Sequence, residues 1–155
     1  MNKITICIPD KINHGVSGVY IFSIGEKFYI GRSIDIKKRL SSHCSKLNYY
    51  IKNYAIVSAG VLNIQDPMKS LYLPMAKYVL EHPKIVEIEI RYVFTYCSHV
   101  EMCAMERSLL RLYEAHPDCI NRIFYASIFD RTLQSINRVK ICNSVAIPDS
   151  GVMAD

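Results

Sequence analysis

The pattern of apolar and polar positions predicts several short strands. Apolar residues alternate with charged ones between residues 85 and 96, as in a strand with one buried face. Two shorter runs, 19–23 and 27–31, flank Gly25 and predict a β-hairpin. The apolar and β-branched residues 3–8 predict a further short strand at the edge of a sheet.

The predicted hairpin carries two tyrosines, Tyr20 and Tyr29, one on each strand. If the turn is centred between Ile24 and Gly25, Tyr20 lies opposite Tyr29. The side chains of directly opposed residues emerge on the same face of a sheet. The pattern therefore predicts two phenol groups close together on one face.

A helix is expected directly after the hairpin, with Ser33 or Asp35 as its N-cap and apolar residues at helical spacing. Arg39 and His43 are four residues apart, so they are neighbours at the edge of the apolar face. We expect both side chains to point toward the hairpin while they touch solvent.

Three more helices are expected downstream, at about 66–82, 98–115 and 130–139. The second is the best defined of the chain, because Ser98 and Glu101 fit a capping box at its start.

The composition is that of a globular protein, with 155 residues of which 50% are hydrophobic and 21% charged. We expect one domain over 1–147 and a loose C-terminal tail at 148–155. No apolar run reaches membrane-spanning length, and the N-terminus lacks the apolar region of a secretory signal. A cytoplasmic protein that does not contact membranes is expected. The cysteines are scattered without zinc spacing, which argues against a structural zinc site.

Positive charge is concentrated in one segment, 32–52, which holds six basic residues and one acidic residue. Its charge of +5 equals the net charge of the whole chain, so the remainder is neutral. A lysine-rich helix by itself is usually a solvated face. This segment, however, directly follows the two tyrosines, which favours contact with a phosphate backbone. The residues expected to bind nucleic acid are Arg32, Lys37, Lys38 and Lys46.

Glu106 lies in the middle of an apolar helix face. Its neighbours three and four residues away are Met102, Cys103, Leu109 and Leu110. An unpaired carboxylate buried there would cost several kcal/mol. It must therefore meet a cation, face a water-filled cleft or take up a proton.

Two explanations of Glu106 have about equal weight when the residue is taken alone. One is a structural ion pair, for example with Arg39, and the other is a metal ligand. A lone carboxylate suits Mg²⁺, or Mn²⁺, because such an ion keeps most of its waters and binds a substrate phosphate as well.

Residues 18–20 (GVY) and 29–31 (YIG) resemble the two signature tripeptides of the GIY-YIG nuclease superfamily. The following helix is similar to the family pattern, with Arg39 and His43 in the expected places. The resemblance implies an α+β fold, in which helices flank a small, mostly antiparallel three-stranded sheet. It also implies a helical insertion and a short C-terminal extension in this chain.

The segment 106–121 looks like the closing segment of the family, with Glu106 as the metal-binding acid and Asn121 as the terminal asparagine. Together the motifs cover residues 18–43 and 98–121. Two tripeptides, an arginine helix, a glutamate and an asparagine in this order are far more specific than one tripeptide.

The chain departs from the family pattern in three places. Val19 replaces the middle isoleucine of the first tripeptide, and Arg32 stands where many members have lysine. The gap between His43 and Glu106 is longer than in minimal members, which points to an insertion at about 48–83. This insertion is either an element that contacts DNA or additional packing.

The resemblance implies a metal-dependent endonuclease that hydrolyses DNA. Tyr20 would be the general base, made acidic enough by nearby positive charge, and His43 would receive or relay the proton. Arg39 would hold the scissile phosphate, and Tyr29 would position water or phosphate. A divalent metal on Glu106 would neutralise the leaving oxygen.

Gly31 and Asn121 would support the site rather than take part in the chemistry. Each candidate also has a plain structural explanation: strand tyrosines are usually half-buried, and an asparagine after a helix is often a turn residue. By itself His43 would be read as a surface histidine. Their joint occurrence in the expected order favours the functional interpretation.

Two alternative functions stay open at this point. One is a structure-selective or RNA-cutting nuclease, and the other is a nucleic-acid-binding module without turnover. Only 34 residues follow Asn121, too few for a linker and a separate DNA-binding domain. Recognition would then depend on the insertion, on the C-terminal elements or on a homo-oligomer, which a double-strand cut also favours.

Overall fold

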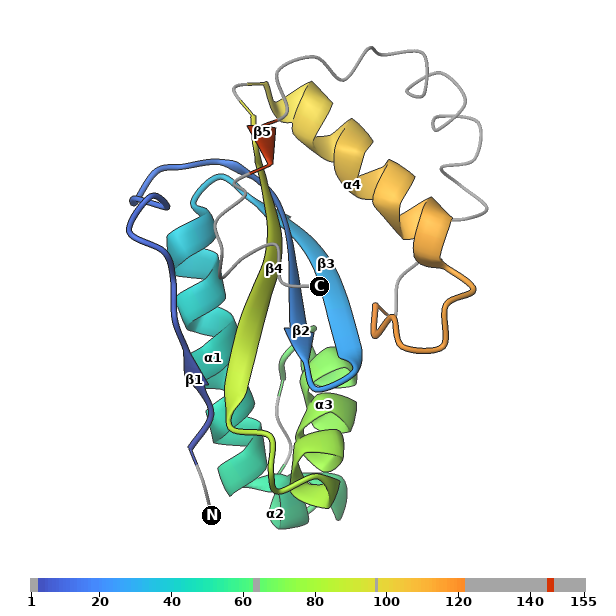
Figure 1. Ribbon diagram of the computed structural model, residues 1–155. Helices are drawn as coiled ribbons and strands as arrows, with labels where there is room; N and C mark the ends of the chain where they lie inside the picture. The colour runs from blue at the N-terminus through green and yellow to red at the C-terminus, as the bar shows by residue number, and fades with distance from the viewer. Residues whose placement is uncertain (1–2, 63–64, 97, 122–144, 147–155) are drawn as a thin grey trace.

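The computed structural model describes residues 3–62, 65–96, 98–121 and 145–146. Its sheet is mixed but mostly antiparallel, in the order β1-β4-β2-β3, and β5 pairs with β4 (Figure 1). Among the strands of the described residues, β1 and β4 form the one parallel pair. The α+β class and the three antiparallel central strands are confirmed. The predicted helix at 130–139 and the tail at 148–155 lie outside the described residues. The strands are β1 (Thr5–Ile6), β2 (Gly18–Ile24), β3 (Lys27–Ser33), β4 (Glu87–Thr95) and β5 (Val145–Ala146).

The hairpin register differs from the predicted one. Gly25 adopts a positive φ of 58°, so the two-residue loop consists of Gly25 and Glu26. Tyr20 therefore pairs with Gly31, while Tyr29 pairs with Phe22. The shift moves each partner by two residues, which preserves the face. Tyr20 and Tyr29 still share one face as diagonal neighbours, with ring centroids 6.3 Å apart.

Helices cover both faces of the sheet (Figure 1). The cluster on one face contains Tyr20, Phe22 and Ile24 of β2 and the apolar sides of α1 and α3. The cluster on the other face contains Val19 and Ile21 and the apolar side of α4. Every residue of β2 is consequently buried. The helices are α1 (Ile36–Lys52), α2 (Tyr54–Ser58), α3 (Lys69–Glu81) and α4 (His99–Tyr113).

Local capping places the two helices that follow the motifs. The Asp35 side chain accepts a hydrogen bond from the Lys38 N–H at the start of α1. The Ser98 side chain accepts one from the Glu101 N–H at the start of α4. Both caps satisfy backbone donors that the first helical turn leaves unpaired. The predicted helix starts are thus confirmed, with Asp35 rather than Ser33 as the first cap.

The segment after α4 covers the outer edge of β3. Phe28 donates its N–H to Asp118 and accepts from Ile120, at 2.9 Å each. Asn121 then bonds the backbone of Ile30 twice: its Oδ1 accepts the N–H at 2.9 Å, and its Nδ2 donates to the carbonyl at 2.7 Å. The amide side chain thus acts like one more residue of a paired strand, and it joins the end of α4 to the hairpin.

Replacing Asn121 by alanine should lower the free energy of unfolding by about 2 kcal/mol or more, because two backbone groups of buried Ile30 lose their partners. Asn53→Ala is the matched control, since the Asn53 side chain makes one exposed bond to the Tyr49 carbonyl. Its loss should stay below about 1 kcal/mol. Urea unfolding followed by circular dichroism measures both. Equal losses in the two variants would contradict this account of β3.

Candidate active site

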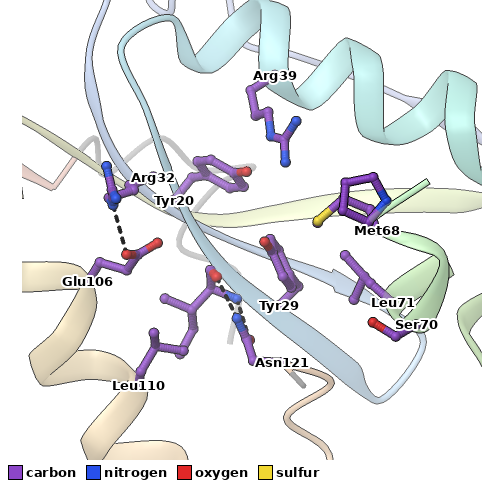
Figure 2. Close-up of a pocket in the computed structure, with 12 residues that line it drawn as sticks. Tyr20, Tyr29, Arg32, Arg39, Met68, Ser70, Leu71, Glu106, Leu110 and Asn121 are labelled. Atoms are coloured by element: carbon purple, nitrogen blue, oxygen red, sulfur yellow. Dashed lines mark hydrogen bonds and ion pairs between the residues drawn. The ribbon is translucent and has the colours of Figure 1, made fainter. Parts of the chain in front are cut away.

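A cleft of about 340 Å³ runs over the edge of β3, between α1, the start of α3 and α4 (Figure 2). Most of the polar groups of this cleft belong to site residues predicted from the sequence. The side chains that line it are Tyr20, Tyr29, Ile30, Arg32, Arg39, Pro67, Met68, Ser70, Leu71, Glu106, Leu110 and Asn121. The fold therefore gathers the two phenols, two guanidinium groups and the distant acid around a common space.

Tyr20 lies at the floor of the cleft and is 0% exposed. Its hydroxyl is 2.6 Å from Nε2 of His43. Burial raises the pKa of Tyr20 well above its usual value. The Arg39 guanidinium lowers this pKa through its charge and a side-chain hydrogen bond, but burial is the larger effect. Contrary to the expectation of a lowered pKa, Tyr20 is therefore a neutral phenol at neutral pH.

Gly31 explains how a large ring fits over its neighbouring strand. It is the cross-strand partner of Tyr20. A Cβ at position 31 would collide with the phenol oxygen of Tyr20 and would lie 2.8 Å from the Tyr29 ring. Only glycine leaves the space that both tyrosine rings use.

His43 is buried, with 1% exposure, so the expectation that it touches solvent was wrong. It lies on the same face of α1 as Leu40 and Leu47, which point into the core. Its Nε2 faces Tyr20, and its Nδ1 is 2.6 Å from the hydroxyl of Tyr72. Burial, followed by the charges of Arg39 and Lys46, lowers the pKa of His43 to about 3. The ring is neutral at physiological pH.

Arg39 and Tyr29 line the cleft next to the buried pair of Tyr20 and His43. Both side chains are half-buried, and Figure 2 shows the guanidinium and the phenol pointing into the cleft from different elements. The Tyr29 ring centroid is 5.2 Å from that of His43. A planar cation and a phenol in this position can both reach a phosphate group that enters the cleft.

Glu106 forms an ion pair with Arg32, Nε to Oε1 2.9 Å, and not with Arg39. Arg32 pairs with Val19 across the hairpin and so lies on the sheet face that α4 covers, whereas Arg39 belongs to α1 on the other face. The Glu106 side chain is 16% exposed, and its second oxygen points toward the cleft (Figure 2). Burial raises the pKa of Glu106, and the charges of Arg32 and Arg107 oppose this effect.

The lysines of the basic segment lie outside the lining of the cleft. Lys38 is exposed and Lys37 half-buried on α1. The Nζ of Lys46 is 3.9 Å from an oxygen of Asp66 and 5.9 Å from the Tyr72 ring centroid. Contact of these lysines with nucleic acid stays a prediction.

The insertion supplies groups that sequence reasoning missed. Met68, Ser70 and Leu71, at the start of α3, form one wall of the cleft, and Tyr72 bonds His43 from within the core. Tyr50 is also buried and stacks on Tyr72 at 5.5 Å. A tyrosine within an apolar helix is typical of simple packing, so the sequence contained no signal for Tyr72.

Two tyrosines, an arginine and a carboxylate thus lie around one open cleft. The family model of the GIY-YIG catalytic domain matches residues 16–116, so the chain belongs to this family. It is a family of phosphodiester hydrolases, its domain implies a nuclease acting on nucleic acid, and its members typically depend on a divalent metal. Comparisons with curated proteins and with solved structures gave no match. Within the described residues, none of the helices is long and apolar enough to cross a membrane.

The buried His43 makes folding sensitive to acid. Its pKa is about 3 in the folded state and about 6.5 in an unfolded chain, so only the unfolded chain binds this proton between those values. Its contribution to stability is complete above pH 6.5 and decreases as the pH falls toward 3, by up to about 1.4 kcal/mol per pH unit. His43→Gln should weaken the pH dependence of urea unfolding between pH 6.5 and 4. The variant His82→Gln, at an exposed histidine, should show the same pH dependence of unfolding as the wild type. Identical curves for all three proteins would contradict the assignment of this pH dependence to His43.

Proposed function

We propose that the protein is a metal-dependent endonuclease that hydrolyses DNA phosphodiester bonds. The observation that carries the proposal is the placement of Tyr20, Arg39 and Glu106 around one cleft that is open to water. A non-catalytic module would have no need for a base, a phosphate clamp and an acid in one cleft.

In-line attack of water requires proton removal and stabilisation of the charge that develops on the phosphate. Arg39 would turn from the Tyr20 hydroxyl to the phosphate and hold it with its planar fork. Tyr20 would then take the proton of the attacking water, while its own proton passes to Nε2 of His43 at 2.6 Å. Tyr29 would orient the water or the phosphate from the wall of the cleft.

The residues present fit a magnesium or manganese ion. The described residues contain no group of three or more histidine, cysteine, aspartate or glutamate side chains that could hold a metal together. A single carboxylate is nevertheless sufficient for an ion that keeps its waters and binds a phosphate oxygen. Glu106 would hold it through the oxygen that points toward the cleft. The ion would supply positive charge to the leaving oxygen.

Glu106→Gln should reduce cleavage of supercoiled plasmid in Mg²⁺ by at least about 100-fold, because the metal loses its charged ligand. Glu114→Gln is the control, because Glu114 is the exposed C-cap residue of the same helix α4. This variant should cleave plasmid like the wild type. EDTA should abolish cleavage by both active proteins.

Two outcomes of this experiment would replace the proposal. Plasmid binding without cleavage by any of the proteins would identify a nucleic-acid-binding module. Cleavage of a structured RNA or of a branched DNA, but not of plasmid, would identify the corresponding nuclease.

Electrostatic contact with the DNA backbone should be measurable apart from catalysis. In the inactive Glu106→Gln background, the double variant Lys37→Gln, Lys38→Gln should bind DNA duplexes more weakly. The loss of affinity should be the same for duplexes of unrelated sequence. The slope of log affinity against log salt should become shallower by about 1 per lost phosphate contact. The pair Lys77→Gln, Lys84→Gln removes the same charge from exposed sites on α3 and beyond it. If both pairs behave alike, the basic segment is not the contact surface.

A further inference from the structure

The imidazole of His43 is held between two phenols. The hydroxyl of Tyr20 is 2.6 Å from Nε2, and the hydroxyl of Tyr72 is 2.6 Å from Nδ1. Tyr20 and Tyr72 are 0% exposed and His43 is 1% exposed. The three side chains come from β2, α1 and α3, so the insertion contributes the third member of a buried hydrogen-bonded chain.

A neutral imidazole has one nitrogen that donates and one that accepts. The two bonds of His43 must therefore run in opposite senses. If Nε2 accepts from Tyr20, Nδ1–H donates to the Tyr72 oxygen. If Tyr72 donates to Nδ1 instead, Nε2–H donates to Tyr20, and His43 has no lone pair left for the Tyr20 proton. Only the first arrangement lets His43 act on Tyr20.

The contacts of Tyr20 favour the first arrangement. Its oxygen already takes a hydrogen bond from Arg39, a group that can only donate. The hydrogen of the buried phenol then needs an acceptor, and Nε2 of His43 is within bonding distance.

We propose that Tyr72 is a positioning residue of this nuclease, whose phenol oxygen accepts the Nδ1–H of His43 and thereby keeps Nε2 open toward Tyr20. Without that oxygen, Nδ1–H would be buried without a partner, which costs more than leaving the nitrogen lone pair unbonded. The ring would then adopt the other tautomer and donate to Tyr20. The inference rests on the proposed function, because it concerns how the Tyr20 proton leaves.

The test compares the wild type with Tyr72→Phe, which removes only the hydroxyl. Tyr78→Phe is the matched control: Tyr78 belongs to the same helix, and its hydroxyl accepts from the Glu26 N–H at 3.2 Å. Nitrogen-15 NMR of histidine-labelled protein reports which ring nitrogen of His43 carries the proton. Plasmid cleavage in Mg²⁺ gives kcat and KM, and duplex binding in EDTA gives the affinity.

We expect wild type and Tyr78→Phe to carry the proton on Nδ1. Tyr72→Phe should carry it on Nε2, with kcat lower by about tenfold or more and with unchanged KM and duplex affinity. A wild-type spectrum with the proton on Nε2 overturns the proposal, and it does so even if Tyr72→Phe fails to fold. A Tyr72→Phe protein that keeps the wild-type tautomer also overturns it, whether or not kcat falls, because a loss of rate would then come from packing.

The NMR result does not depend on cleavage. A protein that shows the predicted tautomer change but cuts no nucleic acid would contradict the proposed function. It would still support the role of Tyr72 in orienting the ring. A protein that cuts DNA with the His43 proton on Nε2 would contradict only the role of Tyr72.

Discussion

The burial of β2 on both faces is the constraint on which the rest of the structure depends. A strand with seven buried residues requires one helical layer on each side, and α1 with α3 and α4 supply these layers. Two layers that meet at the edge of one hairpin leave a cleft over that edge. Arg39 reaches it from one layer and Glu106 from the other. The site is thus a consequence of how the central strand is covered.

A second feature is the placement of polar groups inside the core. Tyr20, His43 and Tyr72 would each cost free energy as unpaired buried groups. Their mutual hydrogen bonds at 2.6 Å offset that cost and fix the ring orientations. Burial also keeps the imidazole neutral by lowering its pKa to about 3. The same packing that stabilises the domain therefore keeps a neutral imidazole next to Tyr20.

Much of the fold was predictable because its determinants are local. The cap at Asp35, the cap at Ser98 and the alternation in β4 depend on residues a few positions apart. The shared face of Tyr20 and Tyr29 survived an error in the hairpin register, because a shift by two residues keeps every side chain on its face. The order of the motifs was sufficient to indicate the family.

The sequence by itself determined strands β1 to β4, the starts of α1 and α4, the family and the position of Glu106 on an apolar face. Only the tertiary structure decided that Glu106 pairs with Arg32, and that His43 is buried and bonded to Tyr72. Periodicity tells which side of an element is apolar. It does not tell which helix covers which face of the sheet, and the partners of Glu106 and His43 follow from that arrangement.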